Sequence, residues 1–327
     1  MTGLMRSTLM VVAAVAIPML ASPTHAQCAA GTQKLIDDHK LDEARAEVQA
    51  LLKKNASDDV ALHCMGMIYV AQDRSGDAQE WFEKAIKVND NSSAHHLWLG
   101  NAIGDQAEHA SKLKQPFMAR RIKSEFERAV QLDPTSIDAR HGLIQFYSQA
   151  PGVMGGSMDK AKEQAREIQK VNAMRGHIEM GSLLDRDKDV AGAEHEFEAA
   201  IVASPDSAPG YNNLASLYRR QKRYADAVPV YERLLKARPD LVNARLNIAY
   251  NLALSGQGLD RGEREARQWF TEPPRDTPAA TMSSAHYILG IIYEKQAKKD
   301  AAREEYAAAV AANPKNEEAK KALANLK

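Results

Sequence analysis

Cysteine is scarce in this chain, and the spacings that mark metal and redox sites are absent. Cys28 and Cys64 are the two cysteines among 327 residues, and no Cys-x-x-Cys pair occurs. The ten histidines include no two that are three or four residues apart, the spacing that places two ligands on one helix face. We therefore expect no metal site and no thiol redox motif.

Motifs of the common enzyme classes are also missing. The glycine-rich segment 150–161 contains Gly155-Gly156-Ser157, but it does not end in the Gly-Lys-Ser or Gly-Lys-Thr of a phosphate-binding loop. It predicts instead an extended turn, with Ser157 capping the next helix. No Gly-x-Ser-x-Gly elbow or metalloprotease signature occurs. We expect no catalytic residues, no cofactor and no enzymatic activity.

Charge of one sign is not in excess. Lysine and arginine number 43, as do aspartate and glutamate, so the formal net charge is zero. The densest basic cluster, Arg120-Arg121-Ile122-Lys123, is followed by Glu125 and Glu127, which is typical of a solvated helix face. The composition therefore gives no indication of a nucleic-acid partner.

One long apolar run occurs, from Leu9 to Leu20, and it lies close to the amino terminus. With Arg6 before it and Thr24-His25-Ala26 after it, residues 1–26 are predicted to be a secretory signal peptide, with the mature chain starting near Gln27. A membrane anchor is the alternative, but the run is shorter than the roughly 20 residues of a spanning helix. A lipid anchor on Cys28 would need a different preceding sequence. We expect a periplasmic or secreted protein without a membrane span in the mature chain.

What the chain does have is a repeat of about thirty-four residues. In residues 59–92, Leu62, Gly66 and Tyr69 share one helical face, and Ala78 and Phe82 mark a second helix after a break. Small residues let two helices approach closely, and the large residues between them fill the gap. The same landmarks return at His177, Gly181, Ala193 and Phe197, at Tyr211, Ala215, Ala227 and Tyr231, and at His286, Gly290, Ala302 and Tyr306.

This pattern resembles the tetratricopeptide repeat (TPR) family. The resemblance implies an all-α fold, a right-handed α-solenoid of about eight helical hairpins with a carboxy-terminal capping helix at 317–327. Four further units match the pattern less closely, and three of them contain insertions, the longest about ten residues. The expected array covers 27–316, with repeats near 27–58, 59–92, 93–136, 137–173, 174–207, 208–241, 242–282 and 283–316.

The two cysteines fall on the leading helices, the first helices of their hairpins, in the first and second repeats. Because leading helices of successive repeats lie side by side, Cys28 and Cys64 can approach within disulfide distance. An oxidising compartment permits such a bond. Two unpaired thiols remain the alternative.

The resemblance also implies a concave groove lined by the leading helices, in which a protein or peptide partner binds. Amides can pair with a peptide backbone, and arginines can hold carboxylates. We expect a role in envelope assembly, transport or secretion. Structural organisation of a larger complex and small-molecule carriage are the alternatives. The expected partner-binding residues are Asn212, Asn213, Arg219, Arg220, Asn243, Asn247, Tyr250, Trp98 and His141.

Overall fold

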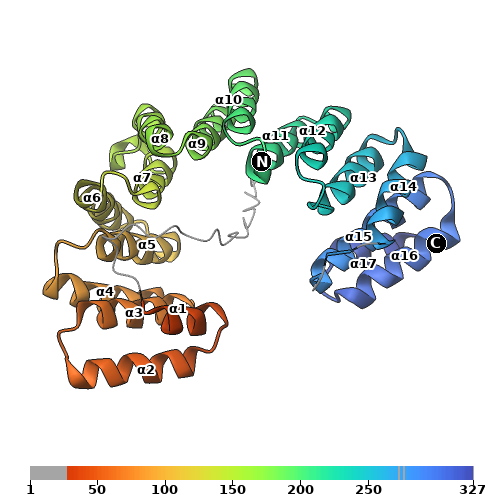
Figure 1. Ribbon diagram of the computed structural model, residues 1–327. Coiled ribbons are helices and arrows are strands. Elements are labelled where there is room, and N and C mark those ends of the chain that lie inside the picture. Colours follow the sequence, from red (N-terminus) through yellow and green to blue (C-terminus); the bar gives the residue numbers. More distant parts are fainter. Residues whose placement is uncertain (1–27, 272, 275–276, 327) are drawn as a thin grey trace, which may run out of the picture. The chain divides into compact units, whose positions relative to one another are not determined.

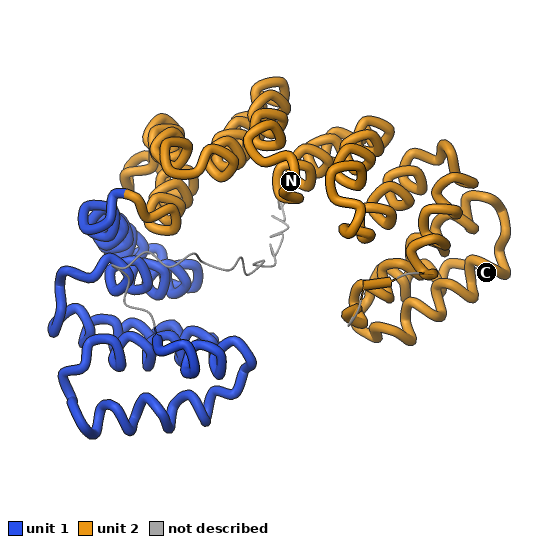
Figure 2. The backbone as a smooth tube through the Cα atoms, viewed as in Figure 1, with its two compact units in different colours: residues 1–134 blue, residues 135–327 orange. Residues whose placement is uncertain are grey.

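The computed structural model describes residues 28–271, 273–274 and 277–326, and within these ranges the regular elements are all helical. The expected signal peptide and its cleavage site lie outside the described residues. The chain divides into two compact units, residues 1–134 and 135–327 (Figure 2). The fold is an all-α helical-repeat solenoid, in which consecutive helices pair as hairpins (Figure 1).

Unit 1 contains three hairpins, and in each the second helix packs against the first. The third has the longest helices, of 17 and 18 residues, so the extra residues predicted in this repeat mainly lengthen its helices. The helices are α1 (Ala30–Asp37), α2 (Leu41–Lys54), α3 (Asp59–Val70), α4 (Ser75–Val88), α5 (Ser93–His109) and α6 (Gln115–Leu132).

Unit 2 contains five hairpins and a final helix, α17, that packs against α16. A short 3-10 turn, η1, precedes α8, and Ser157 caps that helix by accepting a hydrogen bond from the Lys160 amide. The elements are α7 (Ile137–Gln149), η1 (Gly152–Met154), α8 (Met158–Val171), α9 (Ala173–Arg186), α10 (Val190–Ala203), α11 (Ala208–Arg220), α12 (Tyr224–Ala237), α13 (Asn243–Ser255), α14 (Leu259–Thr271), α15 (Ala279–Lys295), α16 (Lys299–Ala312) and α17 (Glu317–Asn325).

In five hairpins the chain reverses direction between the two helices through the same type of turn. In the first of them, His39 adopts φ of 56°, and the Lys40 amide donates to the Leu35 carbonyl at 2.8 Å. This is the Schellman arrangement, which satisfies carbonyls at a helix end and turns the chain sharply. The short turn returns the second helix directly along the first. The equivalent left-handed residues are His39, Asp73, Lys188, Lys222 and Ala297.

A glycine on the leading helix faces an aromatic ring on the second helix in four hairpins. A β-carbon added at Gly100 would lie 2.6 Å from the Phe126 ring, closer than any normal contact. The missing side chain is therefore what lets the ring fill the space between the helices. The pairs are Gly66 with Phe82, Gly100 with Phe126, Gly181 with Phe197, and Gly290 with Tyr306.

Two glycines on α5 provide a matched test of this packing. We predict that Gly100→Ala destabilises the protein by about 1–3 kcal/mol, because the new methyl group overpacks the hairpin. At Gly104, apart from the backbone of its own helix and its chain neighbours, no atom lies within 4 Å of the position of an added β-carbon. Gly104→Ala should therefore stabilise the protein by up to about 1 kcal/mol, because alanine has a higher helix propensity than glycine. Urea unfolding of both variants measures the difference, and equal effects would contradict the proposed packing role.

Candidate functional site

The candidate site is a pocket of about 480 Å³ between the leading helices α13 and α15, within unit 2. From α13 it takes positions i, i+3, i+4 and i+7, which lie on one face of a helix. From α15 it takes the first three turns. The lining residues are Asn243, Leu246, Asn247, Tyr250, Ala280, Thr281, Ser284, Tyr287 and Ile288.

The polar groups of the pocket differ in how firmly they are held. The fully buried Trp269 indole donates from Nε1 to Asn243 Oδ1 at 2.8 Å, which ties the first residue of α13 to α14. Ser284 donates to the Ala280 carbonyl of its own helix at 2.9 Å. Asn247 accepts a hydrogen bond through its backbone carbonyl from Asn251, and the residue is only partly buried.

Two tyrosines form the aromatic part of the wall. The Tyr287 ring lies 5.8 Å from the ring of Tyr306 on α16, which in turn donates to Glu294 at 2.6 Å. Burial raises the pKa of the Tyr287 phenol, and neighbouring Tyr250 adds to this shift. The Tyr287 side chain therefore stays neutral at physiological pH.

The structure brings only part of the predicted groove set to this pocket. Asn243, Asn247 and Tyr250 line it. The two predicted arginines on α11 instead have partners within the array. Arg219 donates to Ser216 at 2.7 Å, and Arg220 pairs with Asp185 at 2.6 Å.

The remaining predicted residues lie apart from the pocket. On α11, Asn212 is exposed, and Asn213 donates to the Pro209 carbonyl of its own helix at 2.9 Å. Trp98, in unit 1, lies 6.4 Å from Phe82 in a stacked arrangement. His141, in unit 2, has its Nδ1 2.9 Å from Glu179, and this carboxylate raises the pKa of His141. These contacts are intramolecular and support packing as readily as partner binding.

Sequence reasoning missed the first turn of α15 as part of the site. The predicted repeat begins at residue 283, whereas the helix begins at Ala279, directly after Pro278. This additional turn contributes Ala280 and Thr281 to the pocket. Pro278 is the signal that could have revealed it, because proline is common at helix starts.

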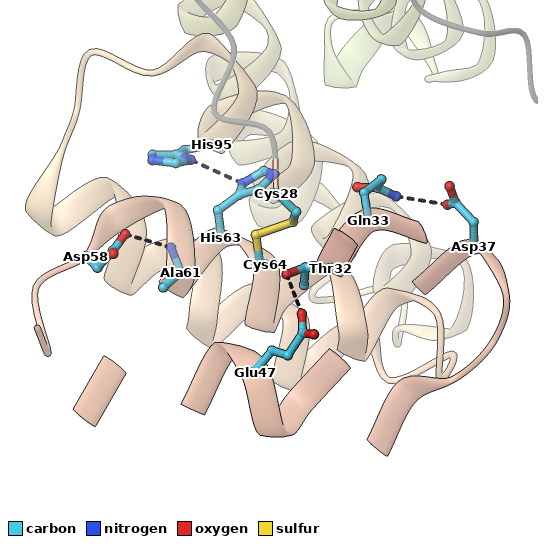
Figure 3. Close-up of a disulfide and its surroundings, with 10 residues drawn as sticks. All are labelled: Cys28, Thr32, Gln33, Asp37, Glu47, Asp58, Ala61, His63, Cys64 and His95. Carbon is cyan, nitrogen blue, oxygen red and sulfur yellow. Dashed lines mark hydrogen bonds between the residues drawn. A yellow bond between two sulfur atoms is a disulfide. The ribbon is translucent and has the colours of Figure 1, made fainter. Parts of the chain in front are cut away.

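The structure joins Cys28 and Cys64 in a disulfide with a Cα–Cα distance of 5.6 Å (Figure 3). Cys64 lies on the leading helix α3 as predicted, whereas Cys28 lies two residues before α1 and not on it, because that helix begins only at Ala30. The bond connects the first two hairpins. A second link joins α1 to α2, where Thr32 donates to Glu47 at 3.0 Å. The amino-terminal hairpin is thus held both covalently and by hydrogen bonding.

A chain of buried polar groups begins next to this disulfide, at His63 (Figure 3). His95 Nε2 lies 3.1 Å from the Asp59 carboxylate, and His95 Nδ1 lies 3.1 Å from His63 Nδ1. The carboxylate accepts from His95 Nε2–H, which leaves His95 Nδ1 to accept from His63 Nδ1–H. Burial lowers the pKa of His63 to about 3 and also lowers the pKa of His95. Both rings are therefore neutral.

Neither a metal cluster nor a spanning helix is found in the described part of the chain. No group of three or more histidine, cysteine, aspartate or glutamate side chains there is arranged to hold a metal ion. None of the described helices is both long and apolar enough to cross a membrane.

These features define an α-helical repeat protein with an open, mostly uncharged pocket. Sequence models of the tetratricopeptide repeat match residues 61–92, 178–254 and 283–316. The chain is a tetratricopeptide repeat protein, as its helix pairs and their glycine–aromatic contacts also indicate.

Three matches to known proteins, one by sequence and two by structure, are distant in sequence. The human protein O-mannosyl-transferase TMTC3 is 26% identical over 227 residues, covering 67% of this chain but 23% of the relative. The chain thus spans about a quarter of that protein's length. The crystal structure of yeast Tom70 matches with a TM-score of 0.60 at 14% identity, over 92% of this chain and 61% of that one. A tetratricopeptide repeat protein from Parabacteroides merdae matches with a TM-score of 0.49 at 16% identity, over 81% and 97%.

Proposed function

We propose that this protein is an exported scaffold that binds a segment of a protein partner in the pocket between α13 and α15, in envelope assembly, transport or secretion. The observation that carries this proposal is the pocket itself, which is formed by the leading helices of two successive repeats. Its amides and hydroxyls can pair with a peptide backbone, and its tyrosines and aliphatic side chains offer apolar contact.

Export is the part of the proposal that rests chiefly on the sequence. The apolar run 9–20 and the small residues before Gln27 support cleavage of a signal peptide. A disulfide between Cys28 and Cys64 is consistent with an oxidising compartment.

Binding without catalysis is the proposed mode of action. The sequence match to the human mannosyl-transferase covers less than a quarter of that protein, and the transferase name belongs to the whole relative. The described part of this chain consists of helical repeats. The pocket contains no charged side chain among its described lining residues that could act as a general acid or base.

Two serines offer a matched test of the site. Ser284, on α15, lines the pocket, whereas Ser182, on α9, does not; both donate to the carbonyl four residues earlier. Ser284→Trp should fill the pocket and reduce partner capture at least tenfold, which corresponds to about 1.4 kcal/mol. Ser182→Trp should leave capture unchanged.

Capture is measured with the protein purified from its own envelope fraction. The intact mass of this purified protein also checks export, because it should equal that of a chain beginning near Gln27. The partner is identified by mass spectrometry with the wild type, and its recovery is then compared between variants. Helical circular dichroism and melting temperature verify that both variants fold. Equal recovery by Ser284→Trp and the wild type would place the binding site elsewhere.

A further inference from the structure

The lining of the pocket between α13 and α15 is uncharged at each of its nine described residues. This is notable in a chain in which 26% of residues are charged. A charged ligand group entering the pocket would lose part of its water without gaining a counter-ion from the lining, which is unfavourable. The lining therefore favours a neutral ligand.

Asn243 is an exposed residue of the pocket lining, and the orientation of its amide is set by Trp269. An indole nitrogen can only donate, and Trp269 Nε1 lies 2.8 Å from Asn243 Oδ1. Rotating the amide by 180° would place its NH₂ group against the indole N–H and leave the fully buried indole without an acceptor. Trp269 thus fixes the amide, and Nδ2 is left to donate to a ligand acceptor such as a peptide carbonyl.

Apolar groups lie beside this donor. Leu246 and Ile288 are buried, and Tyr250 and Tyr287 are partly exposed on the same wall. A volume of about 480 Å³ falls within the range of ligand pockets, roughly 300–1,000 Å³. It is large enough for one large side chain together with its flanking peptide groups.

We infer that the pocket selects an uncharged peptide segment with one large apolar side chain, and that Asn243, oriented by Trp269, donates a hydrogen bond to a carbonyl of that segment. This inference rests on the proposed function, because it names the chemistry of the partner at the same site. Specificity follows from the fixed donor and from the cost of placing a charge next to the uncharged wall.

The test uses the full mature chain and an array of peptides blocked at both ends, so that terminal charges play no part. The tightest binders are resynthesised with aspartate or lysine beside the apolar residue, and their dissociation constants are measured by fluorescence polarisation. We expect each charged replacement to weaken binding to the wild type at least tenfold.

Asn243→Asp is the decisive variant. One carboxylate oxygen can still accept from Trp269, but the donor is replaced by a negative charge. Neutral peptides should bind at least tenfold more weakly than to the wild type, and lysine-containing peptides should bind more tightly than they do to the wild type. A general disruption of the pocket would not produce this exchange of preference. Asn55→Asp, which adds the same charge at the exposed end of α2 in unit 1, should change the affinity for neither class of peptide.

Failure of this inference is distinguishable from failure of the proposed function. If charged and neutral peptides bind equally well and Ser284→Trp abolishes both, the site is correct and its proposed selectivity is wrong. Unchanged binding of neutral peptides to Asn243→Asp would likewise overturn the donor role. If no peptide binds in a manner sensitive to Ser284→Trp, both the inference and the proposed peptide-binding function are wrong.

Discussion

Replacing both Cys28 and Cys64 with alanine should destabilise the amino-terminal hairpins by about 3–4 kcal/mol. The disulfide joins residues separated by 36 positions, and closing a loop of this length in the unfolded chain accounts for an effect of that size. In a repeat array each hairpin contacts only its neighbours. The loss should therefore be concentrated in α1 and α2.

Hydrogen–deuterium exchange measures this effect helix by helix. Exchange in α1 and α2 should accelerate in the double variant, whereas α11 and α12, in unit 2, serve as the internal control. A reductant should reproduce the change in the wild type and have no effect on the variant. Two reactive thiols in denatured, unreduced wild-type protein would show that the bond is not formed.

Acid should destabilise unit 1 as the pH falls from about 6.5 towards 3. Burial keeps His63 neutral in the folded protein down to a pKa of about 3, whereas the unfolded chain protonates it near 6.5. Between these pH values the unfolded state binds more protons than the folded state. The contribution of His63 to the free energy of unfolding is therefore fully present above about pH 6.5 and is lost as the pH falls below it. The loss is on the order of a few kcal/mol. The lowered pKa of His95 acts in the same direction.

His63→Gln and His96→Gln should have opposite effects on this pH profile. Glutamine at position 63 can still donate to His95 but does not titrate, so the profile should become flatter. Burial is the largest single influence on the pKa of His96 and lowers it, but the hydrogen bonds to Glu125 and to the Asp90 carbonyl, together with the charges of these two residues, raise the pKa overall. His96 therefore adds stability at low pH, and its replacement should make the acid loss steeper.

Urea unfolding at several pH values, followed by the fluorescence of Trp81 and Trp98 in unit 1, provides the measurement. Trp269, in unit 2, also contributes to the signal, so hydrogen exchange in α3 and α5 is compared with that in α14 to separate the unfolding of the two units. Parallel profiles for the wild type and His63→Gln would show that another group controls the acid sensitivity.

The sequence by itself determined the repeat architecture. Landmarks such as Gly66 and Phe82 recur at a fixed spacing because a small residue must face a large one wherever two helices pack closely. That requirement is local to one hairpin, so it can be read from a window of about thirty-four residues. It predicted the helix pairs and the all-α fold, and it placed Cys64 on a leading helix, with Cys28 close to the start of the neighbouring one.

The tertiary structure decided which polar residues remain available to a partner. Arg219 and Asn243 are both polar residues on leading helices, and the repeat pattern does not indicate which of the two side chains is available to a partner. Arg219 is held by Ser216 of its own helix and by Tyr231 on α12, whereas Asn243 is oriented by Trp269 on α14. Most of these partners lie on other helices, and side-chain pairing between helices follows no fixed sequence period. The pocket and its fixed donor therefore emerge only when the hairpins are packed together.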